Sequence, residues 1–101
     1  MPTYAISFEF KSDATYPHRY QSFMNQVRLC HRVWTETTSF ALVDTAESLY
    51  TLESRLYCKS DFNHLTDKVL VIDVTGDKGI FRGVNSMPST LGLLMPNVDQ
   101  K

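Results

Sequence analysis

Glu9 is the acidic residue best placed to do chemistry, because it ends an alternating apolar stretch and a polar loop follows it directly. A carboxylate at the end of a central strand suits a general acid or base, or a ligand for a hard cation such as Mg²⁺. Asp13 lies in the same loop and is its candidate catalytic partner. The alternative is that Glu9 faces solvent at a strand edge, as most glutamates do.

Basic and aromatic residues occur together around the first predicted helix. The cations are Lys11, Arg19, Arg28 and Arg32, and the aromatic residues are Tyr16, Tyr20 and Trp34. Cations hold phosphates while aromatic rings stack on bases, so this group is the candidate nucleic-acid surface of the chain. The alternative is a charged helix face that contacts only water.

Other patterns that carry chemistry are absent from the sequence. The two cysteines form no CxxC pair for zinc, and two thiols cannot make a disulfide framework. Cys30 adjoins His31, but adjacent side chains on a helix or strand point apart. Asp73 lies inside the apolar run KVLVIDV. We expect it to face solvent or to be paired, because an unpaired buried charge is costly.

The bulk composition fits one folded domain. The chain has 101 residues, of which 43% are hydrophobic and 21% charged, and these values exclude wholesale disorder. Its formal net charge of -1 excludes a global basic field that would draw it onto nucleic acid. The N-terminal residues do not resemble a signal peptide, and no apolar run approaches the ~18 residues of a membrane helix. A cytoplasmic location without a membrane partner is therefore the default expectation.

Hydrophobic periodicity predicts a strand and then a helix in the first third of the chain. The alternating apolar residues of the strand are Tyr4, Ile6, Phe8 and Phe10. Period-two alternation of this kind is typical of a strand with one apolar face. Pro17 suits the first turn of a helix, and an apolar stripe at helical spacing then runs as far as Cys30.

Residues 33–44 are rich in β-branched and aromatic side chains, so they are expected to be extended. Two strands joined by a tight turn near Thr37 and Thr38 fit this segment best, and one long bent strand is the alternative. Asp44 precedes Glu47 at the spacing of a capping box, which predicts the start of a second amphipathic helix.

The second half of the chain continues with strand signals. The predicted helix ends near Cys58, and the near-continuous apolar run of residues 68–74 predicts a central strand. Glycines within residues 76–79 predict a turn, and residues 80–84 predict a short further strand.

The order strand, helix, strand, strand, helix, strand is the split βαβ or ferredoxin-like arrangement, an α+β fold. Both helices then cover one face of an antiparallel sheet, and the other face stays open. We expect Phe8 and Trp34 to form an apolar patch on that open face, for which a second copy is the simplest cover. Residues 1–84 form this domain, and residues 85–101 form a C-terminal tail that docks on the body or on a partner subunit.

Three segments carry a resemblance to a known family: TYAISFEFKSD, HRVWTETTSFALVDTAESLYTLESRL and DKVLVIDVTGDKGIFRGV. Over residues 3–84 the chain resembles the small ferredoxin-like proteins related to the CRISPR-associated endoribonuclease and adaptation-complex dimer. These include stand-alone relatives labelled SinR-like and, more distantly, VapD-type toxins. The resemblance implies a homodimer and metal-dependent cleavage or binding of RNA or DNA, with Mg²⁺ or Mn²⁺ as the cation. Glu9 stands where the nuclease members carry a metal-binding aspartate.

Three hypotheses of function follow. The first is a homodimeric, nucleic-acid-associated protein in which Glu9 holds the metal with Asp13 and the four cations above hold phosphates. The second is a non-catalytic protein-interaction module that acts through its sheet face and tail. The third is a small-ligand-binding regulator of the ferredoxin-like kind, with its site at the dimer seam.

Overall fold

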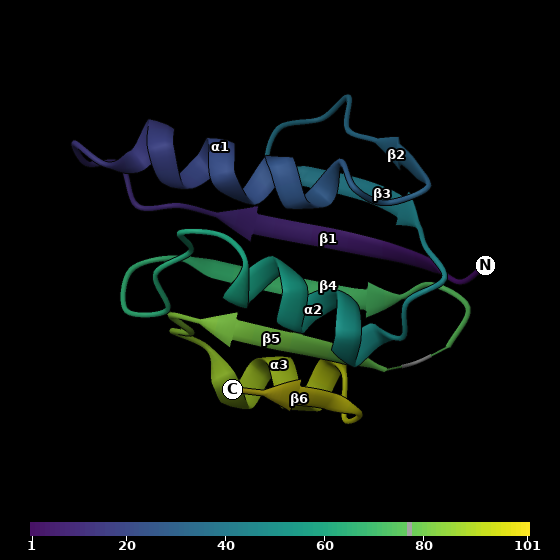
Figure 1. Ribbon diagram of the computed structural model, residues 1–101. Helices are drawn as coiled ribbons and strands as arrows, with labels where there is room; N and C mark the ends of the chain where they lie inside the picture. Colours follow the sequence, from purple (N-terminus) through teal and green to yellow (C-terminus); the bar gives the residue numbers. More distant parts are fainter. Residues whose placement is uncertain (77) are drawn as a thin grey trace.

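A single mixed sheet forms the centre of the molecule, with strand order β2-β3-β1-β4-β5-β6 (Figure 1). The computed structural model describes residues 1–76 and 78–101. The strands are β1 (Thr3–Glu9), β2 (Arg32–Trp34), β3 (Phe40–Asp44), β4 (Lys68–Asp73), β5 (Gly79–Gly83) and β6 (Val98–Gln100). Neighbouring strands are antiparallel, except that β5 and β6 are parallel.

Three helices are found among the described residues, so the α+β class predicted from the sequence is confirmed. They are α1 (Tyr16–Val27), α2 (Leu49–Cys58) and α3 (Pro88–Leu94). Figure 1 shows α1 and α2 side by side on one face of the sheet. As expected, Pro17 lies in the first turn of α1. The helix ends three residues before Cys30, because the next N–H groups turn back to the carbonyls of Met24 and Gln26.

The hydrophobic core lies between the sheet and these two helices. The alternating residues of β1 all point into it, since Tyr4, Ile6 and Phe8 are each at most 4% exposed. The expectation that Phe8 lies on the open face is therefore wrong. Phe8 is two residues from Ile6 and four from Tyr4, so it lies on the same face of the strand as both. Its ring centroid lies 5.0 Å from that of Phe23 in α1.

The segment over residues 33–44 forms two strands, as the first interpretation predicted. The turn between them closes at Ser39, whose φ of 57° lies in the left-handed region. The Thr35 hydroxyl donates to the Phe40 carbonyl across this connection at 2.9 Å. Opposite residues of the two strands then pair, with Trp34 beside Leu42.

Helix α2 begins later than the sequence suggested. Ser48 is its N-cap, and the Ser48 hydroxyl accepts the backbone N–H of Thr51 at 3.2 Å. The capping box predicted from Asp44 and Glu47 is wrong, because Asp44 is still the last residue of β3. Its carboxylate accepts a hydrogen bond from Arg32 at 2.8 Å.

The C-terminal residues form two elements that the sequence did not predict, α3 and β6. Strand β6 pairs with β5 and extends the sheet by one strand. Helix α3 borders a hollow with Leu70 and Phe81. The adjacent residues Val71 and Ile80 point into the core, so Leu70 and Phe81 point to the other face of the sheet. Helix α3 therefore lies on the face opposite α1 and α2. The turn predicted over residues 76–79 includes Asp77, which lies outside the described residues.

Gly83 ends β5 with a φ of 113°, a conformation that L-residues rarely adopt. A Cβ atom there would lie 2.0 Å from the Asp67 carbonyl oxygen. We expect Gly83→Ala to lower the free energy of unfolding by more than ~1 kcal/mol, measured by urea denaturation. Gly92→Ala is the matched control. Its Cβ would meet the Gln100 side chain at 3.5 Å and it lies within α3, so no loss of stability is expected. Equal stability of the two variants would contradict this account.

Candidate functional site

Glu9 is the last residue of β1 and points to the sheet face that α1 and α2 leave uncovered. Its side chain is 72% exposed, and the Lys68 ammonium lies 3.6 Å from one of its carboxylate oxygens. Both side chains border a hollow of about 420 Å³ with Ser7 and Phe40. The structure therefore places this acid at the surface, beside a cation.

Asp13 is held away from that hollow by α1. Its carboxylate accepts hydrogen bonds from the Arg19 guanidinium and the Thr15 hydroxyl, each at 2.9 Å. The Arg19 hydrogen bond is the main cause that lowers the pKa of Asp13 below its usual range. Asp13 thus stays ionised and serves to fix the start of α1.

A divalent cation does not fit the residues around Glu9 in one copy. Mg²⁺ and Mn²⁺ require several oxygen ligands. Within residues 1–76 and 78–101, no group of three acidic, histidine or cysteine side chains is placed to hold a metal ion. The nearest charged group to Glu9 is the ammonium of Lys68, which repels a cation. A metal held by Glu9 would need ligands from a second molecule.

Arg19 lies in the interior rather than on the helix surface where the sequence placed it. The residue is 5% exposed, and its guanidinium donates to both oxygens of Asp67 at 2.6 and 2.7 Å. The remaining donors reach the Thr15 hydroxyl and the Lys11 carbonyl. The guanidinium is therefore fully engaged inside the protein.

Asp67, which sequence reasoning did not single out, is the centre of this network. It is fully buried and accepts three further hydrogen bonds, from the Lys11 and Asn63 N–H groups and the Thr66 hydroxyl. One signal was available in the sequence. Arg19 stands four residues before Phe23, a spacing that places both side chains on one face of a helix.

A second interior ion pair joins α2 to β5. Glu53 is 1% exposed, and its carboxylate accepts hydrogen bonds from Arg82 at 2.5 and 3.2 Å. The Arg82 guanidinium also lies 4.1 Å from the centre of the Tyr57 ring, a cation–π contact. This pair was not predicted from the sequence and holds α2 against the sheet.

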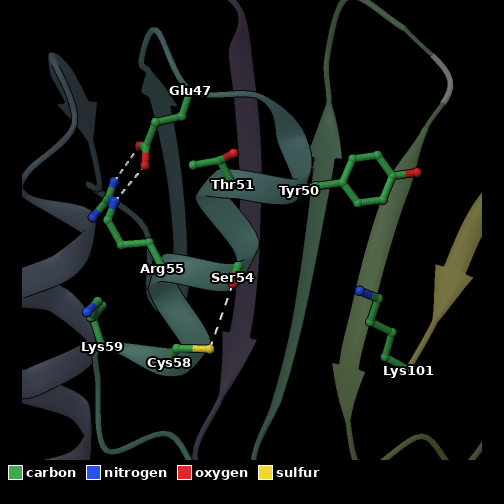
Figure 2. A pocket seen from close by; sticks show the side chains of 8 residues that line it. All are labelled: Glu47, Tyr50, Thr51, Ser54, Arg55, Cys58, Lys59 and Lys101. Atoms are coloured by element: carbon green, nitrogen blue, oxygen red, sulfur yellow. Dashed lines mark hydrogen bonds and ion pairs between the residues drawn. The ribbon is translucent and has the colours of Figure 1, made fainter.

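A third ion pair, between Arg55 and Glu47, borders a hollow of about 570 Å³ (Figure 2). Arg55 also donates to the Gln26 carbonyl and, at 3.4 Å, to the sulfur of Cys30. Burial raises the pKa of the Cys30 thiol despite this hydrogen bond. A reactive thiolate is therefore not favoured at Cys30.

The rest of this hollow is formed by exposed side chains on the outer side of α2. Figure 2 shows Ser54 pointing toward Cys58, with 3.8 Å between oxygen and sulfur. Lys59 and Lys101 lie on opposite sides of the helix in the same view. Because these two cations do not converge, the hollow offers no built anion site.

The predicted basic and aromatic group is divided by the fold. Tyr16, Tyr20 and Arg28 border a polar hollow of about 380 Å³ between α1 and the loop over residues 35–39. The two tyrosine rings stack at 5.8 Å with 20° between their planes. Arg28 is exposed and has no ion-pair partner among the described residues. This hollow retains three of the predicted residues.

Arg32 and Trp34 lie on β2 instead, and their side chains point to the uncovered sheet face. The Arg32 guanidinium lies 2.6 Å from an Asp44 oxygen, and its hydrogen bond lowers the pKa of Asp44. Trp34 is 42% exposed. Arg32 therefore lies on the uncovered sheet face, whereas Arg28 lies beside the hollow between α1 and the loop over residues 35–39.

The uncovered sheet face carries large apolar side chains. Its exposed or half-buried apolar residues are Trp34, Phe40, Leu42, Leu70, Ile72 and Phe81. They come from β2 and β3 on one side of β1 and from β4 and β5 on the other, and β1 presents the smaller Ala5 and Ser7 between them. Contiguous apolar surface of this kind marks an interaction site.

Comparisons with family models, curated proteins and solved structures found no match for the chain. Within the described part of the chain, no helix has both the length and the apolar character needed to cross a membrane.

Removal of Asp67 should leave the buried Arg19 guanidinium with only the partly exposed carboxylate of Asp13 as an ionic partner. We expect Asp67→Ala to lower the free energy of unfolding by about 3–5 kcal/mol, measured by urea denaturation. Asp61→Ala is the control, because Asp61 pairs with His18 at the surface, where the side chains are 54% and 80% exposed. A loss of less than ~1 kcal/mol is expected there. Similar losses in both variants would show that the Arg19–Asp67 pair has no special role.

Proposed function

We propose that this protein functions as a homodimer of ferredoxin-like units, an interaction module that assembles through its uncovered sheet face. The strand order β2-β3-β1-β4 supports the ferredoxin-like part of this proposal. Those strands are antiparallel to their neighbours, with α1 after β1 and α2 after β3, as in a split βαβ arrangement. Elements β5, α3 and β6 extend that unit at one edge.

The observation that carries the proposal is the apolar character of the face opposite α1 and α2. Six strands of three to seven residues, spaced ~4.8 Å apart, present roughly 500 Å² per molecule, including the part over β4 and β5 on which α3 lies. Two such faces together give about 1,000 Å², the lower limit of a specific interface. The same patch on both molecules is self-complementary, which is the symmetry of most homodimers.

The dimer is tested by light scattering after size-exclusion chromatography at micromolar concentration. We expect the wild-type chain to elute as a dimer and Leu42→Glu as a monomer, because the new carboxylate would be buried in the interface. Tyr50→Glu is the control, since Tyr50 is 55% exposed on the opposite side of the molecule. It should remain dimeric and as stable as wild type. A monomeric wild-type protein would refute the proposal.

Association of this dimer with single-stranded RNA or DNA is the second candidate function. The hollow between α1 and the loop over residues 35–39 favours it, because stacked Tyr16 and Tyr20 lie beside the exposed cation Arg28. Aromatic rings that stack on bases, combined with a cation for phosphate, are the usual means of binding single strands. This hollow lies outside the uncovered sheet face and stays accessible in the proposed dimer.

Removal of the Arg28 charge should weaken this binding. We expect Arg28→Ala to raise the dissociation constant roughly tenfold, as loss of one charge-assisted contact of ~1.5 kcal/mol predicts, measured by fluorescence anisotropy with a labelled single strand. Lys59→Ala, a surface cation beyond α2, should bind as wild type does. Equal binding by all three proteins would exclude the hollow as the site.

The same assay addresses cleavage. With Mg²⁺ or Mn²⁺ added, wild type and Glu9→Gln should leave RNA and DNA equally intact, because one copy offers too few metal ligands. Cleavage that Glu9→Gln abolishes would show that two molecules complete a metal site.

A further inference from the structure

The uncovered sheet face has two unlike halves, because α3 lies over one of them. Helix α3 borders a hollow of about 280 Å³ over β4 and β5, formed with Leu70 and Phe81. The other half, formed by β2, β3 and β1, has no helix of the described chain on it (Figure 1). Trp34 and Leu42 belong to this second half. We call it the Trp34 half.

Helix α3 carries apolar side chains that its own chain does not cover. Leu93 is 83% exposed, Leu94 77% and Met87, at the N-cap, 62%. All of the described residues of α3 are exposed or half-buried. A helix of seven residues is not stable on propensity alone, so its apolar side needs a surface to pack on.

We propose that α3 of each molecule packs on the Trp34 half of the partner in the homodimer, an arrangement that rests on the proposed function above. Strands β2 and β6 are at opposite edges of the sheet. A two-fold axis parallel to the strands and midway between the sheets therefore places the α3 half of one molecule over the Trp34 half of the other. Two α3 helices then lie side by side between the two sheets.

The dimensions agree with this arrangement. From the first to the last of six strands, the sheet is about 24 Å wide. Two helices, each ~10 Å across with side chains, fill that width. Direct contact of the two sheets, by contrast, is obstructed by α3 on each of them. The helices thus occupy space that a closer approach of the sheets cannot fill.

The charges in the two surfaces also agree. The sequence of α3, PSTLGLL, contains no charged residue. In the Trp34 half, Arg32 pairs with Asp44, and Glu9 at the end of β1 pairs with Lys68 of β4 at 3.6 Å. No charge is therefore buried without a partner when the two surfaces meet, which favours an apolar occupant over a nucleic acid.

Asp44 provides an independent sign that the Trp34 half is covered. Its side chain is 10% exposed, and one carboxylate oxygen, Oδ1, is buried without a hydrogen-bond partner among the described residues. Buried acceptors are nearly always satisfied in native structures. A donor on the surface that covers this half would satisfy this oxygen.

Cross-linking between two different cysteine variants tests the arrangement. In a Cys58→Ser background, the Trp34→Cys variant is mixed with the Leu94→Cys variant, allowed to exchange subunits and treated with a short bis-maleimide. We expect mixed covalent dimers from the mixture and few dimers from Trp34→Cys alone, because the two copies of Trp34 lie at opposite edges of the paired sheets, ~20 Å or more apart. A size tag on one variant distinguishes mixed dimers from dimers of Leu94→Cys, which the adjacent α3 helices also permit.

The outcomes separate this inference from the proposed function. A dimer by light scattering without cross-links in the mixture would refute the α3 arrangement and leave the homodimer standing. A monomeric wild-type protein would refute both.

A second variant keeps the test independent of the introduced cysteines. Leu94→Glu alters a side chain exposed in the single molecule, so folding should be unaffected. Its dimer dissociation constant should rise at least tenfold. Leu65→Glu, the same change at a leucine 73% exposed before β4, is the matched control and should dimerise as wild type does. Unchanged dimerisation of Leu94→Glu would overturn the inference.

Discussion

The buried ion pair between Arg19 and Asp67 joins the parts of the chain that must meet for the sheet to form. Arg19 comes from α1, Asp67 precedes β4, and the Lys11 backbone at the end of β1 bonds to both of them. Strand β1 lies between β3 and β4 in the sheet, so a contact that fixes its end also helps to hold both neighbours in register. Two charges in an apolar interior are stable only when every hydrogen-bonding group around them is paired, and this network meets that condition.

Because most of the arginines are engaged inside the protein, few are left at the surface to bind an anionic ligand. The chain contains five arginines, and Arg19, Arg55 and Arg82 hold the two large helices to each other and to the sheet. Arg32 pairs with Asp44, which leaves Arg28 as the arginine free for a phosphate among the described residues. With a net charge of -1, the protein has no strong field to attract a polyanion. The surfaces left for recognition are therefore mainly apolar or aromatic.

The sequence predicted the features that depend on local periodicity. The alternation in β1, the split into β2 and β3, and the apolar run of β4 all follow from the sequence pattern. The same alternation places Phe8 on the core face with Tyr4 and Ile6. The expectation that it lies on the open face rested on the size of its side chain and not on its position in the alternation. Both Asp44 and Ser48 are residue types that cap helices, and either could begin α2. Asp44 instead pairs with Arg32 across β2 and β3, so Ser48 is the N-cap.

Features that depend on contacts distant in the sequence were not predictable in the same way. Arg19 and Asp67 are 48 residues apart and Glu53 and Arg82 are 29 apart, so no local pattern reveals these pairs. Strand β6 has three residues and α3 seven, both too short for a clear periodicity. These C-terminal elements matter most for assembly. A sheet face of roughly 500 Å² per molecule is at the lower limit for a stable interface. In the proposed dimer, the apolar side chains that α3 adds beside that face would supply the area that the sheet alone lacks. Since association requires more than area alone, the packing of α3 would then set the affinity of that dimer, while the sheet would set its orientation.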